Sequence, residues 1–306
     1  MRELSAALER LGLRAAVVTP LAGDASHRRF FRVGLAGGGT VVACLYPESE
    51  ELQAARDAAI QRWGLGHNLP LPNLVGHDDR LTVSQDLGDD DLERVMSAGW
   101  AALRPKVLDA LASFQSCPLD GLPTPPFDAL FWRRELGGFE RFAVPAGHSD
   151  GPAVGTFLDR LAAALAAHPY RLVHRDFHVN NLFLRDGRVW AVDFQDMRAG
   201  PDTYDAASLL RERAGVHLAG DPEGFLVEAA VRLAWPDGWH QRYLECAAQR
   251  GLKVVGTFRR LAAEGRCGYL AWIGEVATQT EQALTELAAP GEVVVALRRA
   301  ASGRGV

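Results

Sequence analysis

Two short stretches in the middle of the chain decide its fold: VHRDFHVNNLFL, residues 173–184, and VDFQDM, residues 192–197. In both, apolar residues that are typical of buried strands flank acidic and amide side chains. An ionised carboxylate that is buried without a partner is costly, so a core cannot hold these groups unpaired. These side chains must either form hydrogen bonds and ion pairs with one another or bind a ligand that carries a positive charge.

The spacing predicts a β-hairpin from the strands VNNLFL and WAVDF with the turn RDGR between them. This hairpin would place Asn181 and Asp193 near each other at its edge, with Asp176 on the loop just before it. A carboxylate and an amide oxygen suit Mg²⁺, which keeps waters and phosphate oxygens as its other ligands. Asp176 could then accept the proton of a hydroxyl that attacks a terminal phosphate. This order of Asp, Asn and a separate metal-binding Asp is that of the kinase catalytic loop.

Each of these residues alone would be interpreted as a turn residue or a loop cap. Together, in this order and in a strand–turn–strand setting, they favour phosphoryl transfer. For His174 we expect a structural role. His178 either lies at the surface or faces the substrate.

Composition excludes several classes of protein. The chain has 306 residues, enough for two lobes, and a formal net charge of -5 with no basic block, so nucleic acid is not the expected partner. No run approaches the roughly 20 apolar residues that span a membrane. The four cysteines form no CxxC pair, which favours a reducing compartment. We expect a cytoplasmic protein with no obligate protein partner.

The order of elements predicts an α+β fold with two lobes. Residues 1–88 form the first lobe, in which a helix, three strands, a second helix and two further strands follow one another. Ser49 is the expected N-cap of the second helix and Gly64 its end. Residues 89–306 form the second, mainly helical lobe, interrupted by a proline-rich connector and by the hairpin. The expected helices there cover residues 89–99, 104–117, 131–144, 157–169, 203–213, 224–235, 239–265 and 271–288.

Over nearly its whole length the chain resembles the aminoglycoside phosphotransferase and choline kinase group, distant relatives of protein kinases. The segment QDLG, residues 85–88, is similar to the hinge whose backbone binds adenine, which implies that Gln85 and Leu87 contact the nucleotide. The segment DFQDMRAGPDTYDAASLL resembles the one that follows the metal-binding Asp in this group, and Asp205 within it is expected to anchor a loop or a helix. The resemblance implies a protein-kinase-like fold that uses ATP and Mg²⁺.

Within that group the likeness is greatest to bacterial kinases that phosphorylate N-acetylmuramate and N-acetylglucosamine at C1 during cell-wall recycling. The two central stretches carry it, together with GDASHRRFFRV, residues 23–33, and AAQRGLKVVGTFRRL, residues 247–261. The resemblance implies a small sugar as the substrate.

The sequence departs from protein kinases where the nucleotide phosphates bind. The third strand, VVACLYP, has no lysine, and GDAS stands in place of a GxGxxG loop. The backbone at Ser26 could approach phosphate oxygens. Arg28 and Arg29 point to opposite faces of a strand, and Arg29 is the predicted substitute for the lysine.

The acceptor is less well defined by the sequence. Trp132 and Arg133 lie on a helix that could face the acceptor, where Arg133 would pair with the carboxylate of N-acetylmuramate, although an aromatic at helical spacing is more often part of the core. Three alternatives stay open: a kinase acting on an aminoglycoside, choline or another amino sugar; a pseudokinase that only binds nucleotide; and a metal-dependent hydrolase that uses Asp176. An acidic acceptor site would favour cationic substrates, whereas an arginine there would favour N-acetylmuramate.

Overall fold

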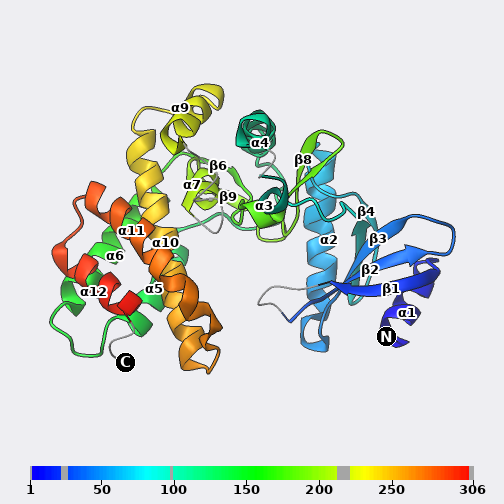
Figure 1. Ribbon diagram of the computed structural model, residues 1–306, viewed down its shortest axis with the longest axis horizontal. Coiled ribbons are helices and arrows are strands. Elements are labelled where there is room, and N and C mark those ends of the chain that lie inside the picture. The colour runs from blue at the N-terminus through cyan, green and yellow to red at the C-terminus, as the bar shows by residue number, and fades with distance from the viewer. Residues whose placement is uncertain (1, 22–26, 97–98, 212–220, 303–306) are drawn as a thin grey trace. The chain divides into compact units, whose positions relative to one another are not determined.

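The computed structural model describes residues 2–21, 27–96, 99–211 and 221–302. The chain divides into two compact units (Figure 1). Unit 1 comprises Met1–Thr124 and Asn180–Met197, and unit 2 comprises Pro125–Val179 and Arg198–Val306. This division differs from the boundary expected at residue 88, because the central hairpin and the helix before the proline-rich connector group with the sheet in unit 1.

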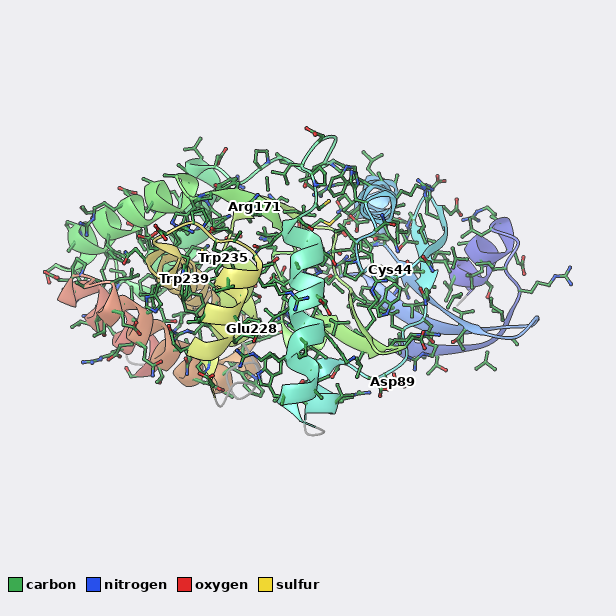
Figure 2. All side chains as sticks on the ribbon, turned by 90° about the horizontal axis from the view of Figure 1, so that it is seen from above. Cys44, Asp89, Arg171, Glu228, Trp235 and Trp239 are labelled. Carbon is green, nitrogen blue, oxygen red and sulfur yellow. The ribbon has the colours of Figure 1, made fainter. Side chains whose placement is uncertain are left out.

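Unit 1 is built on a five-stranded antiparallel sheet of strand order β1-β2-β3-β5-β4, which confirms the predicted strands. Alternate residues of β2 and β3 point toward α1, where they form a core with Leu4 and Leu8: Phe31, Val33, Val41, Ala43 and Leu45. Cys44, marked in Figure 2, faces the other way and packs with Tyr46 and Ala54 under α2. The elements are α1 (Arg2–Arg10), β1 (Ala15–Leu21), β2 (Arg29–Leu35), β3 (Thr40–Leu45), α2 (Glu51–Gly66), β4 (Leu74–Asp78) and β5 (Leu81–Gln85).

The expected ends of α2 are wrong by a few residues. Ser49 lies in the 3₁₀ turn η1 (Glu48–Glu50), and Glu50 is the N-cap without a side-chain capping bond. Gly64 does not end the helix, which continues to Gly66. A side chain at Gly64 would place its Cβ 2.5 Å from Leu71 Cδ1, so the glycine allows close packing rather than a stop.

The predicted hairpin is present, with β7 (Leu182–Arg185) antiparallel to β8 (Arg188–Ala191). It begins later than expected, because residues 179–181 form the 3₁₀ turn η3. Backbone bonds tie it to unit 1: the Leu184 N–H donates to the Asp90 carbonyl at 2.8 Å and the Ala191 N–H to the Pro70 carbonyl at 2.7 Å. Two helices flank it, α3 (Leu92–Val95) and α4 (Trp100–Gln115), and α4 packs against β8.

Unit 2 is mainly helical, as predicted, and α10 (Trp239–Ala263) is its longest described helix, lying beside α5 and α11 (Figure 1). The rings of Trp235 and Trp239, labelled in Figure 2, pack in a tilted arrangement with centroids 6.0 Å apart, just before and at the start of α10. The other elements are α5 (Ala129–Ala143), α6 (Gly151–Ala166), β6 (Tyr170–Val173), β9 (Arg198–Pro201), α7 (Tyr204–Arg211), α9 (Pro222–Arg232), η4 (Cys267–Trp272), α11 (Ile273–Glu286) and α12 (Gly291–Ser302). The sequence did not predict α12.

Two glycines allow α5 and α10 to cross at close range. A Cβ on Gly256 would lie 2.5 Å from the carbonyl carbon of Gly138, a distance that real side chains do not tolerate. One and two turns away along α10, Lys253 and Gln249 both contact Glu135 of α5. The crossing therefore sets up a polar cluster between these helices. Within the described residues, no helix is long and apolar enough to cross a membrane.

Candidate active site

The loop that carries Asp176 is fixed by its backbone. Asp205 of α7 is fully buried, and its carboxylate accepts the N–H groups of His174 at 2.7 Å and Arg175 at 2.9 Å. This is the anchoring role predicted for Asp205. Arg175 has φ of 81°, a conformation that is unfavourable for residues other than glycine. The bonds around it hold this backbone in place, as is common at functional sites.

Asp176 itself is surrounded by cations. Arg250 of α10 donates to Asp176 Oδ1 at 3.4 Å and also to the carbonyl of Arg175. Burial opposes ionisation of Asp176, but the charges of Lys253, Arg250 and Arg175 outweigh it and hold the pKa of its carboxyl below the usual range. Its side chain is 30% exposed, so it is an ionised carboxylate that remains accessible.

Glu135 connects these cations. Its Oε1 lies 2.7 Å from an Arg175 nitrogen and 3.3 Å from Lys253 Nζ, and its Oε2 accepts from Gln249 at 2.8 Å. Although Glu135 is largely buried, Lys253 and Arg175 lower the pKa of its carboxyl. Arg250 and Lys253 were not predicted from the sequence to lie near Asp176. Their three-residue spacing, which puts them on one face of α10, was the available signal.

The predicted metal ligands lie at the open end of the hairpin in unit 1. The carbonyl of Asn181 accepts the N–H of Val192 at 2.9 Å, which sets Asn181 beside the segment that carries Asp193. Asp193 has φ of 61°, and its Oδ1 accepts from Gln195 at 2.8 Å and from Arg28 at 3.1 Å. Its Oδ2 takes part in neither bond, and the side chain is 37% exposed. Asp193 thus keeps an accessible carboxylate oxygen.

This donor set fits a magnesium ion that is shared with phosphate. In the described part of the chain, no group of three or more His, Cys, Asp or Glu side chains forms a complete metal site. Mg²⁺ is usually held by one or two carboxylates, waters and substrate phosphates rather than by a full set of protein ligands. A carboxylate oxygen and a neighbouring asparagine, Asp193 and Asn181, match that pattern.

The structure separates the two consecutive arginines. Arg29, the predicted phosphate ligand, is 57% exposed and pairs with Glu3 of α1 at 3.5 Å. Arg28 is 16% exposed and lies beside Asp193. The geometry therefore places Arg28, and not Arg29, next to the predicted metal ligand. Ser26 lies outside the described residues.

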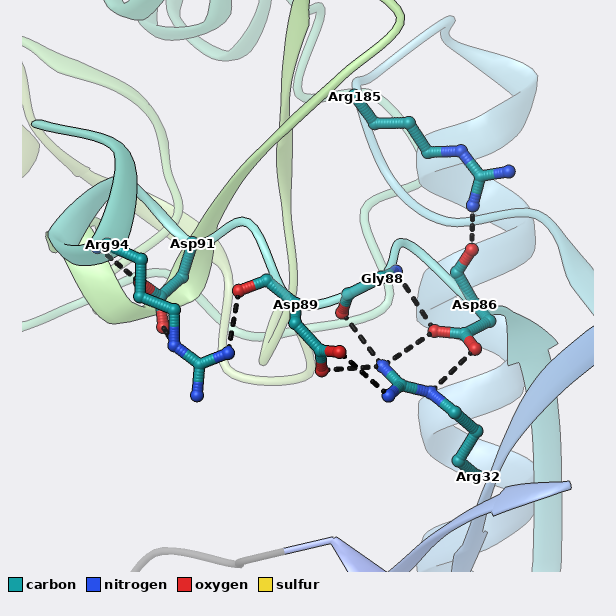
Figure 3. A network of polar contacts seen from close by, with 7 residues as sticks. All are labelled: Arg32, Asp86, Gly88, Asp89, Asp91, Arg94 and Arg185. Atoms are coloured by element: carbon teal, nitrogen blue, oxygen red, sulfur yellow. Dashed lines mark hydrogen bonds and ion pairs between the residues drawn. The ribbon is translucent and has the colours of Figure 1, made fainter. Parts of the chain in front are cut away.

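The predicted hinge is held by a network of ion pairs (Figure 3). Arg32 of β2 lies 2.7 Å from Asp86 and 2.9 Å from Asp89, and it donates to the Gly88 carbonyl at 2.9 Å. Arg185 of the hairpin donates to the Asp86 carbonyl (Figure 3). These contacts fix the backbone that follows β5.

The two predicted nucleotide contacts lie within this fixed segment. Gln85 pairs with Val41 at the end of β5, and its side chain accepts the N–H of Asn73 at 3.2 Å. Leu87 is 6% exposed. The Gln85 N–H donates to the Asn73 carbonyl at 2.8 Å, so a backbone contact of Gln85 with adenine would have to use its carbonyl.

The predicted acceptor residues differ in their surroundings. The Arg133 guanidinium pairs with Asp159 and Glu140, both at 2.5 Å, so it joins α5 to α6. Trp132 is fully buried in an aromatic cluster, as expected for a core residue. His178 is 6% exposed, and its N–H donates to the Asp176 carbonyl at 3.0 Å. These contacts favour a structural role for Arg133 and leave His178 close to Asp176.

A kinase-like α+β fold in which Asp205 anchors the loop that bears Asp176 points to a phosphotransferase. A model of the Phosphotransferase enzyme family (APH) matches residues 17–247, and the chain belongs to this family. This confirms the resemblance and the enzyme class predicted from the sequence.

Curated relatives agree with this assignment. The chain is 30% identical over 267 residues to the N-acetylmuramate/N-acetylglucosamine kinase of Neisseria meningitidis serogroup B, covering 80% of this chain and 78% of that protein. It is 29% identical over 311 residues to the protein of that name from Pseudomonas aeruginosa, covering 94% and 90%.

Solved structures confirm the predicted fold class. A choline/ethanolamine kinase family protein from Mesorhizobium loti superposes with a TM-score of 0.64 at 16% identity, covering 99% of this chain and 98% of that one. Amicoumacin kinase hAmiN superposes with a TM-score of 0.65 at 15% identity, covering 91% and 92%. At such identities the likeness establishes the fold only.

Proposed function

We propose that this enzyme transfers the terminal phosphoryl group of ATP to the anomeric C1 hydroxyl of an N-acetylated amino sugar, N-acetylmuramate or N-acetylglucosamine. The observation that carries the proposal is the anchored, ionised Asp176 among cations of α10 and its own loop. The names of the curated relatives support the substrate class. In this role the enzyme would act in the cytoplasm on sugars recovered from the cell wall.

Asp176 would orient the sugar hydroxyl and accept its proton as the bond from its oxygen to the γ-phosphorus forms. The bond from that phosphorus to the bridging oxygen of ADP breaks in the same step, and ADP leaves. An anomeric hydroxyl is more acidic than an ordinary alcohol, so a carboxylate is an adequate base. The lowered pKa of Asp176 keeps it ionised and able to accept the proton, although it also makes the carboxylate a weaker base. General-base assistance contributes about 10²–10⁴ in rate. Gln85 and Leu87 would position the adenine through the backbone of the fixed hinge.

Asn181 and Asp193 would hold Mg²⁺ together with the nucleotide phosphates. The bound ion would neutralise charge that develops on the phosphoryl group during transfer. Asp193 would offer its Oδ2 to the ion, because its Oδ1 already accepts bonds from Gln195 and Arg28. In this arrangement the chain supplies positioning and charge, which dominate phosphoryl transfer.

The charges around Asp176 favour an acceptor without a positive charge. Arg250 and Lys253 raise the local potential enough to overcome the burial of a carboxylate. The same potential disfavours choline and aminoglycosides, which are cationic, and favours the carboxylate of N-acetylmuramate.

The test is ATP consumption with magnesium against N-acetylmuramate, N-acetylglucosamine, glucosamine, choline and kanamycin. We expect turnover on the N-acetylated sugars and an acid-labile phosphate product. Turnover on kanamycin or choline alone would refute the proposed acceptor, but the protein would still be a phosphotransferase. Free phosphate with no sugar phosphate would show a hydrolase instead.

Two variants test the residues. Asp176→Asn and Asp193→Asn should each lower turnover by at least about 10² while the protein stays folded. Asp186→Asn is the matched control, because Asp186 lies in the hairpin turn with φ of 52° and is 84% exposed. Turnover near that of the wild type in either active-site variant would refute its assigned role.

A further inference from the structure

Arg28 connects two carboxylates from distant parts of unit 1. One of its terminal nitrogens lies 3.1 Å from Asp193 Oδ1 at the end of the hairpin. The other lies 3.7 Å from Asp57 Oδ2 on α2. Only 16% of the Arg28 side chain is exposed, and its guanidinium lies 5.6 Å from the ring centre of Phe30. A largely buried arginine with two acidic partners is a built feature rather than a solvated surface group.

Asp57 is itself held in place. It is 4% exposed, and it accepts a hydrogen bond from the Tyr46 hydroxyl at 2.8 Å and another from Gln53 at 2.7 Å. Because these bonds fix the carboxylate, Asp57 provides a rigid anchor for one side of the Arg28 guanidinium.

This geometry matches that of the phosphate-binding lysine of protein kinases, which this chain lacks. In protein kinases a lysine of the third strand contacts the nucleotide phosphates and pairs with a glutamate of the helix that follows. Here β3 has no lysine. Arg29, the first residue of β2, pairs with Leu45, the last residue of β3. Arg28 precedes Arg29 and therefore lies next to the C-terminal end of β3. From there it reaches the helix carboxylate, Asp57, and also Asp193.

We propose that Arg28, positioned by Asp57, binds the phosphates of the nucleotide in place of the missing lysine. This inference rests on the proposed function. A guanidinium carries five N–H donors, so Arg28 can keep its contact with Asp57 while its other nitrogens bond phosphate oxygens. Arg28 takes the role that was predicted for Arg29, because Arg29 pairs with Glu3 of α1 instead.

The experiment is calorimetric titration of ATP and of adenosine into the wild type, Arg28→Met and Arg29→Met. Loss of a charge-assisted contact should weaken ATP binding by Arg28→Met about ten- to a hundredfold. Adenosine, which has no phosphates, should bind this variant as it binds the wild type. Arg29→Met, the matched change on the next residue, should retain wild-type affinity for both.

Two more variants separate positioning from folding. Arg28→Lys keeps a charge at the site and should recover part of the ATP affinity. Asp57→Asn removes the anchor charge but keeps its shape, and it should weaken ATP binding more than adenosine binding. Thermal unfolding of each variant shows whether it is folded.

The possible results distinguish failure of the role proposed for Arg28 from failure of the proposed function. Unchanged ATP affinity in Arg28→Met, or an equal loss for adenosine, overturns the role of Arg28 and leaves the proposed function. A loss in Arg29→Met alone would do the same and restore the choice of Arg29. A wild-type protein that binds no ATP would overturn both the proposed function and this inference.

Discussion

Arg250 of α10 and Asp176, on the loop after β6, form an ion pair of 3.4 Å although 74 residues separate them in the chain. The same arginine donates to the Arg175 carbonyl, and its guanidinium lies 4.7 Å from the ring centre of Tyr204. Its side chain is 3% exposed. Arg250 thus ties the loop that bears Asp176 to the longest described helix of unit 2.

Replacing Arg250 should impair catalysis more than substrate binding. Arg250→Lys keeps the charge but loses the planar fork whose two nitrogens bond the carbonyl and the carboxylate separately, so we expect kcat to fall about tenfold or more with little change in the KM for ATP. Steady-state kinetics measure the split. Arg260→Lys is the control, since Arg260 lies on the same helix in an exposed pair with Glu264. Equal kcat in Arg250→Lys and the control would contradict a positioning role for Arg250.

The pH dependence of turnover should reflect the cations near Asp176. Because they lower its pKa, Asp176 stays ionised from neutral pH down to mildly acidic pH, and its protonation should limit turnover only below its ordinary pKa of about 3.9. By the same linkage, Asp176 stabilises the fold above that pH, and this contribution is lost as the pH falls through its lowered pKa.

Removing one cation should shift this limit upward. Lys253→Met takes away a charge that lowers the pKa of Asp176, so turnover should fall at a higher pH than in the wild type. Profiles of kcat/KM against pH measure the shift. Lys106→Met is the control, because the other lysine of the chain donates to the Gly187 carbonyl in unit 1. If kcat/KM falls at the same acidic pH in Lys253→Met as in the wild type, a group other than Asp176 determines that fall.

The close crossing of α5 and α10 should depend on Gly256. Gly256→Ala would push a Cβ against the backbone of Gly138, and such overpacking costs about 1–3 kcal/mol of unfolding free energy. Urea unfolding measures the loss. Gly274→Ala on α11 is the control, because no atom lies within 4 Å of its added Cβ, and it should be neutral or stabilising. Equal stability of the two variants would mean that the crossing relaxes freely.

The hinge network predicts a specific effect on nucleotide affinity. Arg32→Met removes the contacts to Asp86, Asp89 and the Gly88 carbonyl, so the hinge backbone should become less ordered. We expect the KM for ATP to rise several-fold with kcat nearly unchanged. Arg10→Met, which breaks an exposed pair with Asp78 in the same unit, serves as the comparison. An unchanged KM for ATP in Arg32→Met would show that the order of the hinge backbone does not affect nucleotide binding.

Most of the local structure could be predicted from the sequence. The five strands of the sheet and the hairpin follow from alternating apolar residues and turn residues, which are properties of neighbouring positions. The ends of elements were less certain: Gly64 was the predicted end of α2, yet it lies inside the helix, where an added Cβ would clash with Leu71. Packing against a distant segment overrides such a local preference.

The sequence by itself determined the phosphotransferase class, through the order of Asp176, Asn181 and Asp193 around one hairpin. Only the tertiary structure decided that Arg28 rather than Arg29 lies beside Asp193, and that Arg250 and Lys253 surround Asp176. Periodicity shows which residues share a face of one helix or strand. It does not show which face meets which distant element, because that choice depends on packing between segments far apart in the chain.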